Sequence, residues 1–100
     1  MATDKTTAEG ILAQLSAVAE ARIRPMFGEY VVYVDEKVIG QINESRLFIK
    51  RTKFGETFAP ELESASPYPG AKAAFVVPPE KLADAIWLRD FVVGTRGQVK

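Results

Sequence analysis

The sequence predicts an α+β fold of two layers, with elements in the order α-β-β-β-α-β-α and an antiparallel meander covered on one face by helices. Three observations support this prediction. The 100 residues, 47% of them apolar, suffice for one hydrophobic core but not for two. Segments near both ends repeat apolar residues at helical spacing, and short β-branched and aromatic runs lie between them. We therefore expect a single domain over 1–100, with an ordered core over about 6–94.

The first element is predicted to be a helix. Thr6-Thr7-Ala8-Glu9 has the pattern of a capping box, in which a Thr hydroxyl and a Glu carboxylate satisfy free amides of the first turn. The apolar residues that share one helical face are Ile11, Leu12, Leu15, Val18 and Ala19. Arg22 and Arg24 would lie at the negative end of the helix dipole, and Pro25 cannot continue a helix. We therefore expect the helix to end just before Pro25.

Three strands are expected next. Residues 29–34 are mostly β-branched and aromatic without alternation, which is typical of a strand covered on both faces. Polar turns at 35–37 and 43–45 would connect this strand to two more, over 38–43 and 46–51. Alternate residues of the third strand would face the core, so its second face is expected to be only partly covered.

The second half of the chain is predicted to add a helix, a strand and a helix. Three apolar residues at four-residue steps within 54–63 predict a short helix, although Pro60 lies inside it. The segment 64–70 has the composition of a loop, and 72–77 is predicted to be a strand that two prolines end. A last helix from about residue 79 would stop before Gly94, and the residues beyond would form a frayed tail.

Composition removes several classes of function. The chain has no Cys and no His, which excludes disulfides, thiolate or imidazole metal sites and His-based catalysis. Thirteen Lys and Arg balance thirteen Asp and Glu, so no field of one sign favours nucleic acid or a membrane. No apolar run exceeds five residues, so no membrane span and a cytoplasmic location are expected. The carboxylates show no clear acid–base pair, and no cofactor or metal is expected.

Several short motifs resemble, in their order and spacing, the N-terminal domain of the TfoX/Sxy family over roughly residues 8–93. The motif positions that carry the resemblance are Met26, Phe27, Gly28, Tyr33, Gly40, Tyr68, Pro69, Gly70 and Lys72. The resemblance implies the α+β fold above, with an architecture like that of small secretion-chaperone domains. It also implies a regulatory role, because the named members of the family are transcriptional co-activators of natural competence. Those members also carry a further helical C-terminal domain. This chain is expected to be a stand-alone N-terminal domain without it.

A cluster of basic residues is a candidate contact site for a partner or a nucleic acid. Arg46, Lys50, Arg51 and Lys53 place four cations in eight residues, and Phe48 lies between two of them on the same strand face. Cations that follow phosphates and a ring that stacks on a base are features of single-strand nucleic-acid sites. Lysines and arginines also protect a sheet edge against aggregation. Because the net charge is zero, we expect only weak binding of DNA.

Trp87 and Phe91 form a second candidate surface, since they lie four residues apart on the last predicted helix. The face of that helix expected to cover the sheet carries Leu82, Ala85, Ile86, Val92 and Val93. Two interpretations stay open. The two rings could form the contact of a two-fold homodimer, or the first helix or the 64–70 loop could cover them within one chain.

The function that the sequence favours is a non-enzymatic interaction module that acts through a protein partner. A small enzyme that uses carboxylate, Lys or Tyr chemistry is the alternative from another class. It would need a pocket with at least two convergent ionisable groups. A weak nucleic-acid binder that uses the 46–53 strand is the third possibility.

Overall fold

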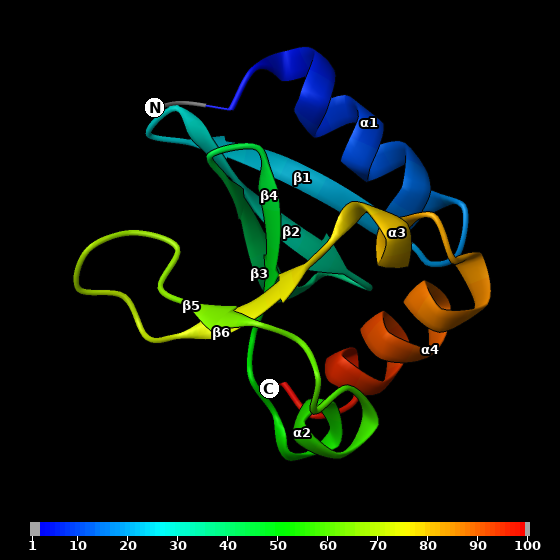
Figure 1. Cartoon of the computed structure of the whole chain (residues 1–100). Helices are drawn as coiled ribbons and strands as arrows, with labels where there is room; N and C mark the ends of the chain where they lie inside the picture. The colour runs from blue at the N-terminus through cyan, green and yellow to red at the C-terminus, as the bar shows by residue number, and fades with distance from the viewer. Residues whose placement is uncertain (1–2, 100) are drawn as a thin grey trace.

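A computed structural model describes residues 3–99 as a six-stranded antiparallel sheet with four helices (Figure 1). The elements are α1 (Lys5–Ser16), β1 (Ala21–Met26), β2 (Glu29–Val34), β3 (Lys37–Asn43), β4 (Arg46–Ile49), α2 (Lys53–Phe58), β5 (Ser64–Ala65), β6 (Ala74–Val77), α3 (Pro79–Leu82) and α4 (Ala85–Arg96). The strand order is β1-β2-β3-β4-β6-β5, and every neighbouring pair is antiparallel. The predicted α+β fold class is confirmed, with two strands more than expected.

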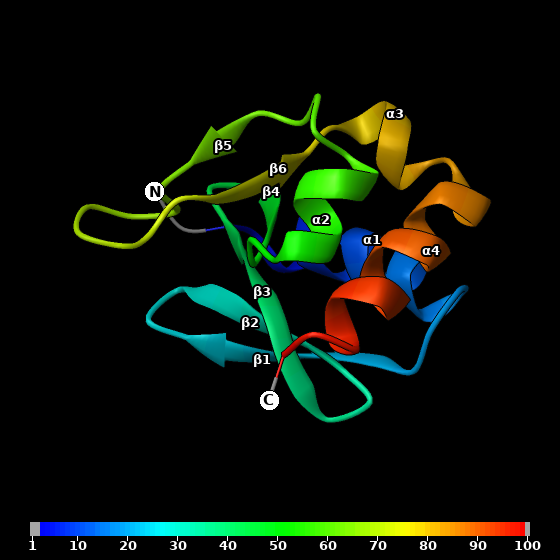
Figure 2. The ribbon, with the colours of Figure 1, turned by 90° about the horizontal axis from the view of Figure 1, so that it is seen from below.

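The helices lie on one side of the sheet, and the loop between β5 and β6 projects on the other side (Figures 1 and 2). The hydrophobic core fills the space between the sheet and α1 and α4. Its largest fully buried side chains from the helices and the facing strands include Leu15, Val32, Val34, Ile39, Ile42, Leu47, Ile49, Phe75, Leu88, Phe91 and Val92. We call the opposite side of the sheet the open face.

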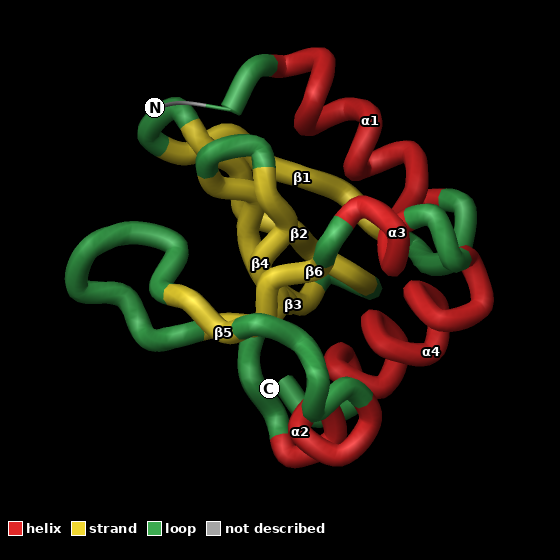
Figure 3. Tube along the Cα trace, in the orientation of Figure 1, coloured by secondary structure: helices red, strands yellow, loops and turns green. Residues whose placement is uncertain are grey.

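Two-residue turns connect the first four strands (Figure 3). Both residues of each turn have positive φ: Phe27 (52°) and Gly28 (81°), Asp35 (50°) and Glu36 (65°), and Glu44 (49°) and Ser45 (65°). Such turns follow the right-handed twist of paired strands. The predicted meander is confirmed, and it begins one strand earlier than expected.

The first helix is shorter than predicted, because residues 21–26 form β1 and not the last turns of α1. Ala21 and Ile23 pack against the core, and the two arginines that alternate with them are exposed. This period of two is the signature of a strand. Pro25 is tolerated because β1 lies at the edge of the sheet, where a missing amide need not break the ladder.

Asp4, and not Thr6, caps α1: its carboxylate accepts a hydrogen bond from the Thr7 amide at 2.8 Å. In the middle of the chain, α2 ends at Phe58, before Pro60, so this helix is shorter than predicted. Residues 64–65, expected to be part of a loop, form β5 and pair with β6.

The last predicted helix is divided in two and extends further. Asp84 interrupts it and caps α4, because its carboxylate accepts from the Trp87 amide at 3.1 Å. The interruption changes which face is buried. In α4 the buried residues are Leu88, Phe91, Val92 and Thr95. Ile86 and Val93, expected to cover the sheet, are 68% and 50% exposed.

Gly94 lies inside α4 and does not end it. A Cβ atom on Gly94 would lie 2.2 Å from the Phe54 ring, so the glycine permits close packing between α4 and α2. The residues after Gly94, which were expected to form a frayed tail, are also held against the rest of the fold. The Gln98 side chain accepts from the Phe54 amide at 2.9 Å, and Val99 packs against the core.

Candidate binding groove on the open face of the sheet

A row of side chains crosses the open face over four strands. The register places Val31 of β2 opposite Gln41 of β3, Gln41 opposite Phe48 of β4, and Phe48 opposite Val76 of β6. Residues paired directly across antiparallel strands project from the same face. The row therefore forms the floor of the open face, apolar except for the amide of Gln41.

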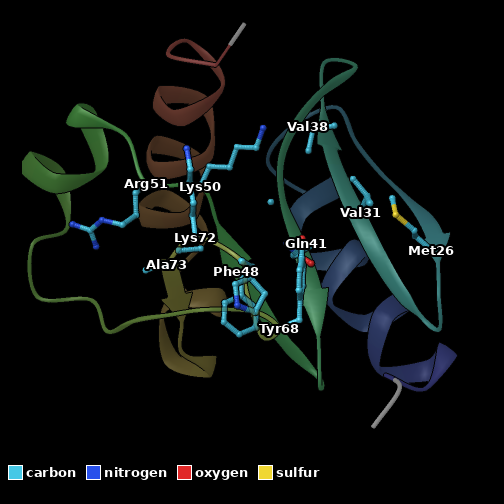
Figure 4. Close-up of a pocket in the computed structure, with 14 residues that line it drawn as sticks. Met26, Val31, Val38, Gln41, Phe48, Lys50, Arg51, Tyr68, Lys72 and Ala73 are labelled. Atoms are coloured by element: carbon cyan, nitrogen blue, oxygen red, sulfur yellow. The ribbon is translucent and has the colours of Figure 1, made fainter.

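Two adjoining hollows lie over this floor, with volumes of about 540 and 420 Å³. They share four lining residues, Met26, Val31, Gln41 and Tyr68. Figure 4 shows the larger hollow with its lining side chains. We call the two hollows together the open-face groove, which lies over Val31, Gln41 and Phe48 between the β1–β2 turn and the loop 66–73.

The β1–β2 turn places an apolar side chain in solvent at one end of the groove. Phe27 is 98% exposed and has a φ of 52°, and Met26 next to it is 47% exposed. A bulky residue pays a conformational cost at positive φ, and Phe27 regains nothing by burial. Gly28, with a φ of 81°, completes the same turn, so its role is in the backbone. A strained and fully exposed Phe is therefore a candidate contact residue.

The loop 66–73 forms the opposite wall. The Asn43 side-chain amide donates to the carbonyl of Pro67 at 3.0 Å, which fixes the loop to the sheet. The Ala71 amide donates to the carbonyl of Tyr68 at 3.1 Å, across Pro69 and a Gly70 of positive φ. Proline and then a glycine of positive φ are the residues that a type II turn requires. This turn presents Tyr68, 52% exposed, to the groove.

Three cations lie along the larger hollow: Lys50, Arg51 and Lys72. Arg51 is partly engaged, because it pairs with Glu56 at 3.3 Å, donates to the Ser64 hydroxyl and lies over the Phe75 ring. Lys50 and Lys72 are exposed and have no ion-pair partner among residues 3–99. The groove therefore has two unpaired positive charges.

The basic cluster predicted from the sequence is only partly assembled. Phe48 is 1% exposed and packs with Ala74 and Val76, so its face is not free to stack on a base. The guanidinium of Arg46 lies 5.0 Å from its ring centroid. Lys53 begins α2 and does not line the groove. The second face of this strand was expected to be only partly covered. That expectation is wrong at Phe48, because side chains of β6 and β5, those of Ala74, Val76 and Ala65, pack around its ring.

Trp87 and Phe91 are covered within the chain, where Phe58 of α2 packs against both rings. Phe91 is fully buried, and Phe58 lies 6.0 Å from its ring and 5.8 Å from that of Trp87. Of the two interpretations, the structure therefore favours cover of the rings within one chain, although by α2, which was not among the elements expected to cover them. Self-association of two chains through this helix stays a prediction, but exposed Trp87 and Phe91 rings no longer support it.

Among residues 3–99, Glu29 is the one acidic residue that lines the groove, and its carboxylate is engaged. It accepts from the Thr3 amide and hydroxyl at 3.0 and 2.5 Å and from the Glu44 amide at 3.2 Å. Partial burial would raise the pKa of Glu29, but these hydrogen bonds outweigh it, so the pKa lies below its usual value. A carboxylate held in this way secures the structure and is not positioned as a general acid or base.

All but one of the motif positions fall into two groups, one that shapes the backbone and one that lines the groove. Gly28, Pro69 and Gly70 shape turns, and Gly40 permits close approach, because a Cβ there would lie 2.0 Å from the Phe48 carbonyl oxygen. The motif side chains that line the groove are Met26, Phe27, Tyr68 and Lys72. Tyr33 lies outside it, with the Arg22 guanidinium 3.9 Å from its ring centroid. Segments far apart in sequence thus bring their motif side chains to one surface.

Sequence reasoning missed the floor residues Val31 and Gln41. The signal was present in the turn at Glu44 and Ser45, because a two-residue turn fixes the register that places Gln41 opposite Phe48.

The fold and the groove together define a small α+β domain with a candidate binding surface on its open face. Among residues 3–99, no group of three or more acidic side chains is arranged to hold a metal ion. The helices of the described chain are too short or too polar to cross a membrane.

The model of the TfoX N-terminal domain family matches residues 13–95, and the chain belongs to this family. An uncharacterised 12.7 kDa protein from the trpE 5′ region of Spirochaeta aurantia is 42% identical over 76 residues. The match covers 76% of this chain and 66% of that protein, so the chain spans just under two thirds of its relative. The family predicted from the short motifs is confirmed.

Proposed function

We propose that this chain is a non-enzymatic, cytoplasmic interaction module that binds a protein partner through the open-face groove and takes part in transcriptional regulation. The observation that carries the proposal is Phe27, a large apolar side chain held in solvent by a strained turn. Membership of the TfoX N-terminal domain family supports the regulatory part.

The groove favours binding over catalysis. Its one carboxylate is engaged by Thr3 and Glu44, and its other charged side chains are cations. It is also long and open, whereas sites for small substrates enclose most of their ligand. A protein segment laid over Met26, Phe27 and Tyr68 would bury three of the large apolar side chains that the fold leaves exposed.

Site-specific photocrosslinking tests the proposal in cells. A benzophenone amino acid replaces Phe27 in one variant and Ile86 of α4 in a control, since both side chains are exposed and apolar. We expect nuclease-resistant adducts with another polypeptide from position 27 and none from position 86. Adducts that nuclease removes, or adducts from position 86 alone, would contradict the proposal. An adduct of two copies of this chain would identify the partner as a second copy.

The regulatory part needs a separate readout. We expect Phe27→Asn to change the same transcripts as deletion of the whole gene, and Ile86→Ala to leave them at parental levels. A deletion that alters no transcripts would argue against a role in transcription while leaving the interaction itself in place.

A further inference from the structure

The open-face groove is apolar at one end and positively charged at the other. Met26 and Val31 lie at the apolar end, and Lys50 and Lys72 lie at the charged end. Figure 4 shows the two groups on opposite sides of Gln41. A ligand that fills the groove must match this division.

The exposed charge at the end of the groove away from Phe27 is positive, because the larger hollow is lined by cations, whereas Glu29, the acidic residue among the described lining residues, lines the smaller hollow. The Glu29 oxygens accept hydrogen bonds from Thr3 and from the backbone of Glu44. Lys50 and Lys72 lack an ion pair among the described residues, 3–99. Complementary charge on a partner would therefore be negative and would lie at the end away from Phe27.

The floor binds through side chains and not through strand addition. The backbones of β3 and β4 are paired on both sides within the sheet. A partner over Gln41 and Phe48 consequently finds no free ladder of amides and carbonyls, which strand addition requires. Apolar contact and charge must supply the recognition.

On these grounds, and resting on the proposed function, we propose that the groove binds a polypeptide segment in which apolar side chains lie next to acidic ones. An aromatic or aliphatic side chain packs against Met26, Phe27 and Val31. One or more carboxylates pair with Lys50 and Lys72. The apolar side chain provides most of the affinity, and the carboxylates set the direction in which the segment lies.

Selection from a random peptide library on the immobilised full chain tests this chemistry. We expect enriched peptides to combine an aromatic or aliphatic residue with Asp or Glu. The same selection on the double variant Lys50→Glu/Lys72→Glu is expected to enrich Lys or Arg in place of the acids. Both lysines are exposed and unpaired, so the variant should retain the circular dichroism and melting temperature of the parent.

Fluorescence anisotropy with the most enriched acidic peptide measures how much the two lysines contribute to the affinity. The double variant is expected to bind about tenfold more weakly at low salt, and the difference should shrink as salt rises. Lys5→Glu is the matched control, because Lys5 is an exposed lysine of α1 that lines neither hollow, and it should bind like the parent.

Three outcomes would overturn the inference: no enrichment, enriched peptides without carboxylates, or affinity that the charge reversal leaves unchanged. A single-stranded oligonucleotide that displaces the peptide and binds more tightly would also overturn it. Crosslinks to a polypeptide from position 27, together with selected peptides that lack acids, would reject this inference while the proposed function stands. Absence of any polypeptide crosslink from position 27 would reject the proposed function itself.

Discussion

The two faces of the sheet are built from the same strands and serve different ends. On the helix-covered face Val32 and Val34 of β2 are fully buried, whereas Val31 on the open face of the same strand is only partly covered. The covered face concentrates the apolar burial that stabilises the fold. The open face keeps its apolar groups where a partner could reach them. A substitution should therefore affect either stability or binding, according to the face on which it lies.

β4 is the exception to this division. Leu47 and Ile49 face the main core, while Phe48 on the other side is buried with Ala74 and Val76. β4 and its neighbour β6, and not β2 as predicted, are therefore covered on both faces. The small cluster around Phe48 gives the groove a rigid floor.

The largest expected effect tests the covered face. Phe91→Ala should cost about 3–5 kcal/mol of unfolding free energy, because it removes a fully buried ring that contacts Phe58, Phe75 and Trp87. Denaturant unfolding followed by circular dichroism measures it. Ile86→Ala, on an exposed side of the same helix, should stay within about 0.5 kcal/mol of the parent. Equal losses in the two variants would break the contrast.

Gly40 tests the packing between strands. Gly40→Ala should cost about 3 kcal/mol, because the new Cβ would lie 2.0 Å from a backbone oxygen that cannot turn aside. Gly10→Ala is the control, since nothing lies within 4 Å of a Cβ in that part of α1, and it should gain about 0.5–1 kcal/mol. Denaturant unfolding measures the loss of stability in Gly40→Ala and the gain in Gly10→Ala. A Gly40→Ala variant more stable than the parent would refute the close contact between Gly40 and the Phe48 carbonyl.

Glu29 connects the open-face rim to stability through pH. Its pKa is lowered in the folded chain, so its contribution is complete above the unfolded value of about 4.3 and is lost as pH falls through the folded value. Glu29→Gln should cost about 1 kcal/mol at neutral pH, and the gap should close in acid. Unfolding curves from pH 7 to pH 3 would show this. A gap that persists in acid would point to packing and not to the charge.

The smallest effect on stability should come from the side chain that matters most for the proposed partner. Phe27→Asn places in the turn a residue that tolerates positive φ, so it should gain about 0.5 kcal/mol. The same variant should lose the enriched peptides. Paired melting and anisotropy measurements test both halves. A variant that binds like the parent would remove Phe27 from the site.

Much of the fold could be predicted because local signals agreed with it. The strands at 29–34 and 38–43 and the proline-terminated strand before Pro78 were found from composition and turns. β1 was missed because Pro25 after two arginines imitates a helix end, and an edge strand tolerates that proline. The break at Asp84 was missed because a single Asp is a common residue inside amphipathic patterns.

The candidate site was harder to predict than the fold. Motif positions such as Phe27 and Tyr68 were identified by resemblance, but nothing local to them shows that they meet across the sheet. Burial of Phe48 depends on β6, whose pairing with β4 is a long-range contact. Exposure of Trp87 was misjudged for the same reason, because α2 covers it from a distant part of the sequence.

The connections between strands also imply an order of assembly. β1 to β4 are joined by tight turns, so each can pair with its neighbour by closing a very small loop, which is fast. β6 must instead enter beside β4, with Phe75 reaching Ile49 only after the chain between them has folded back. We therefore expect the wall that carries Tyr68 and Lys72 to form after the meander. A chain emerging during synthesis would then complete the candidate groove only after the meander has formed.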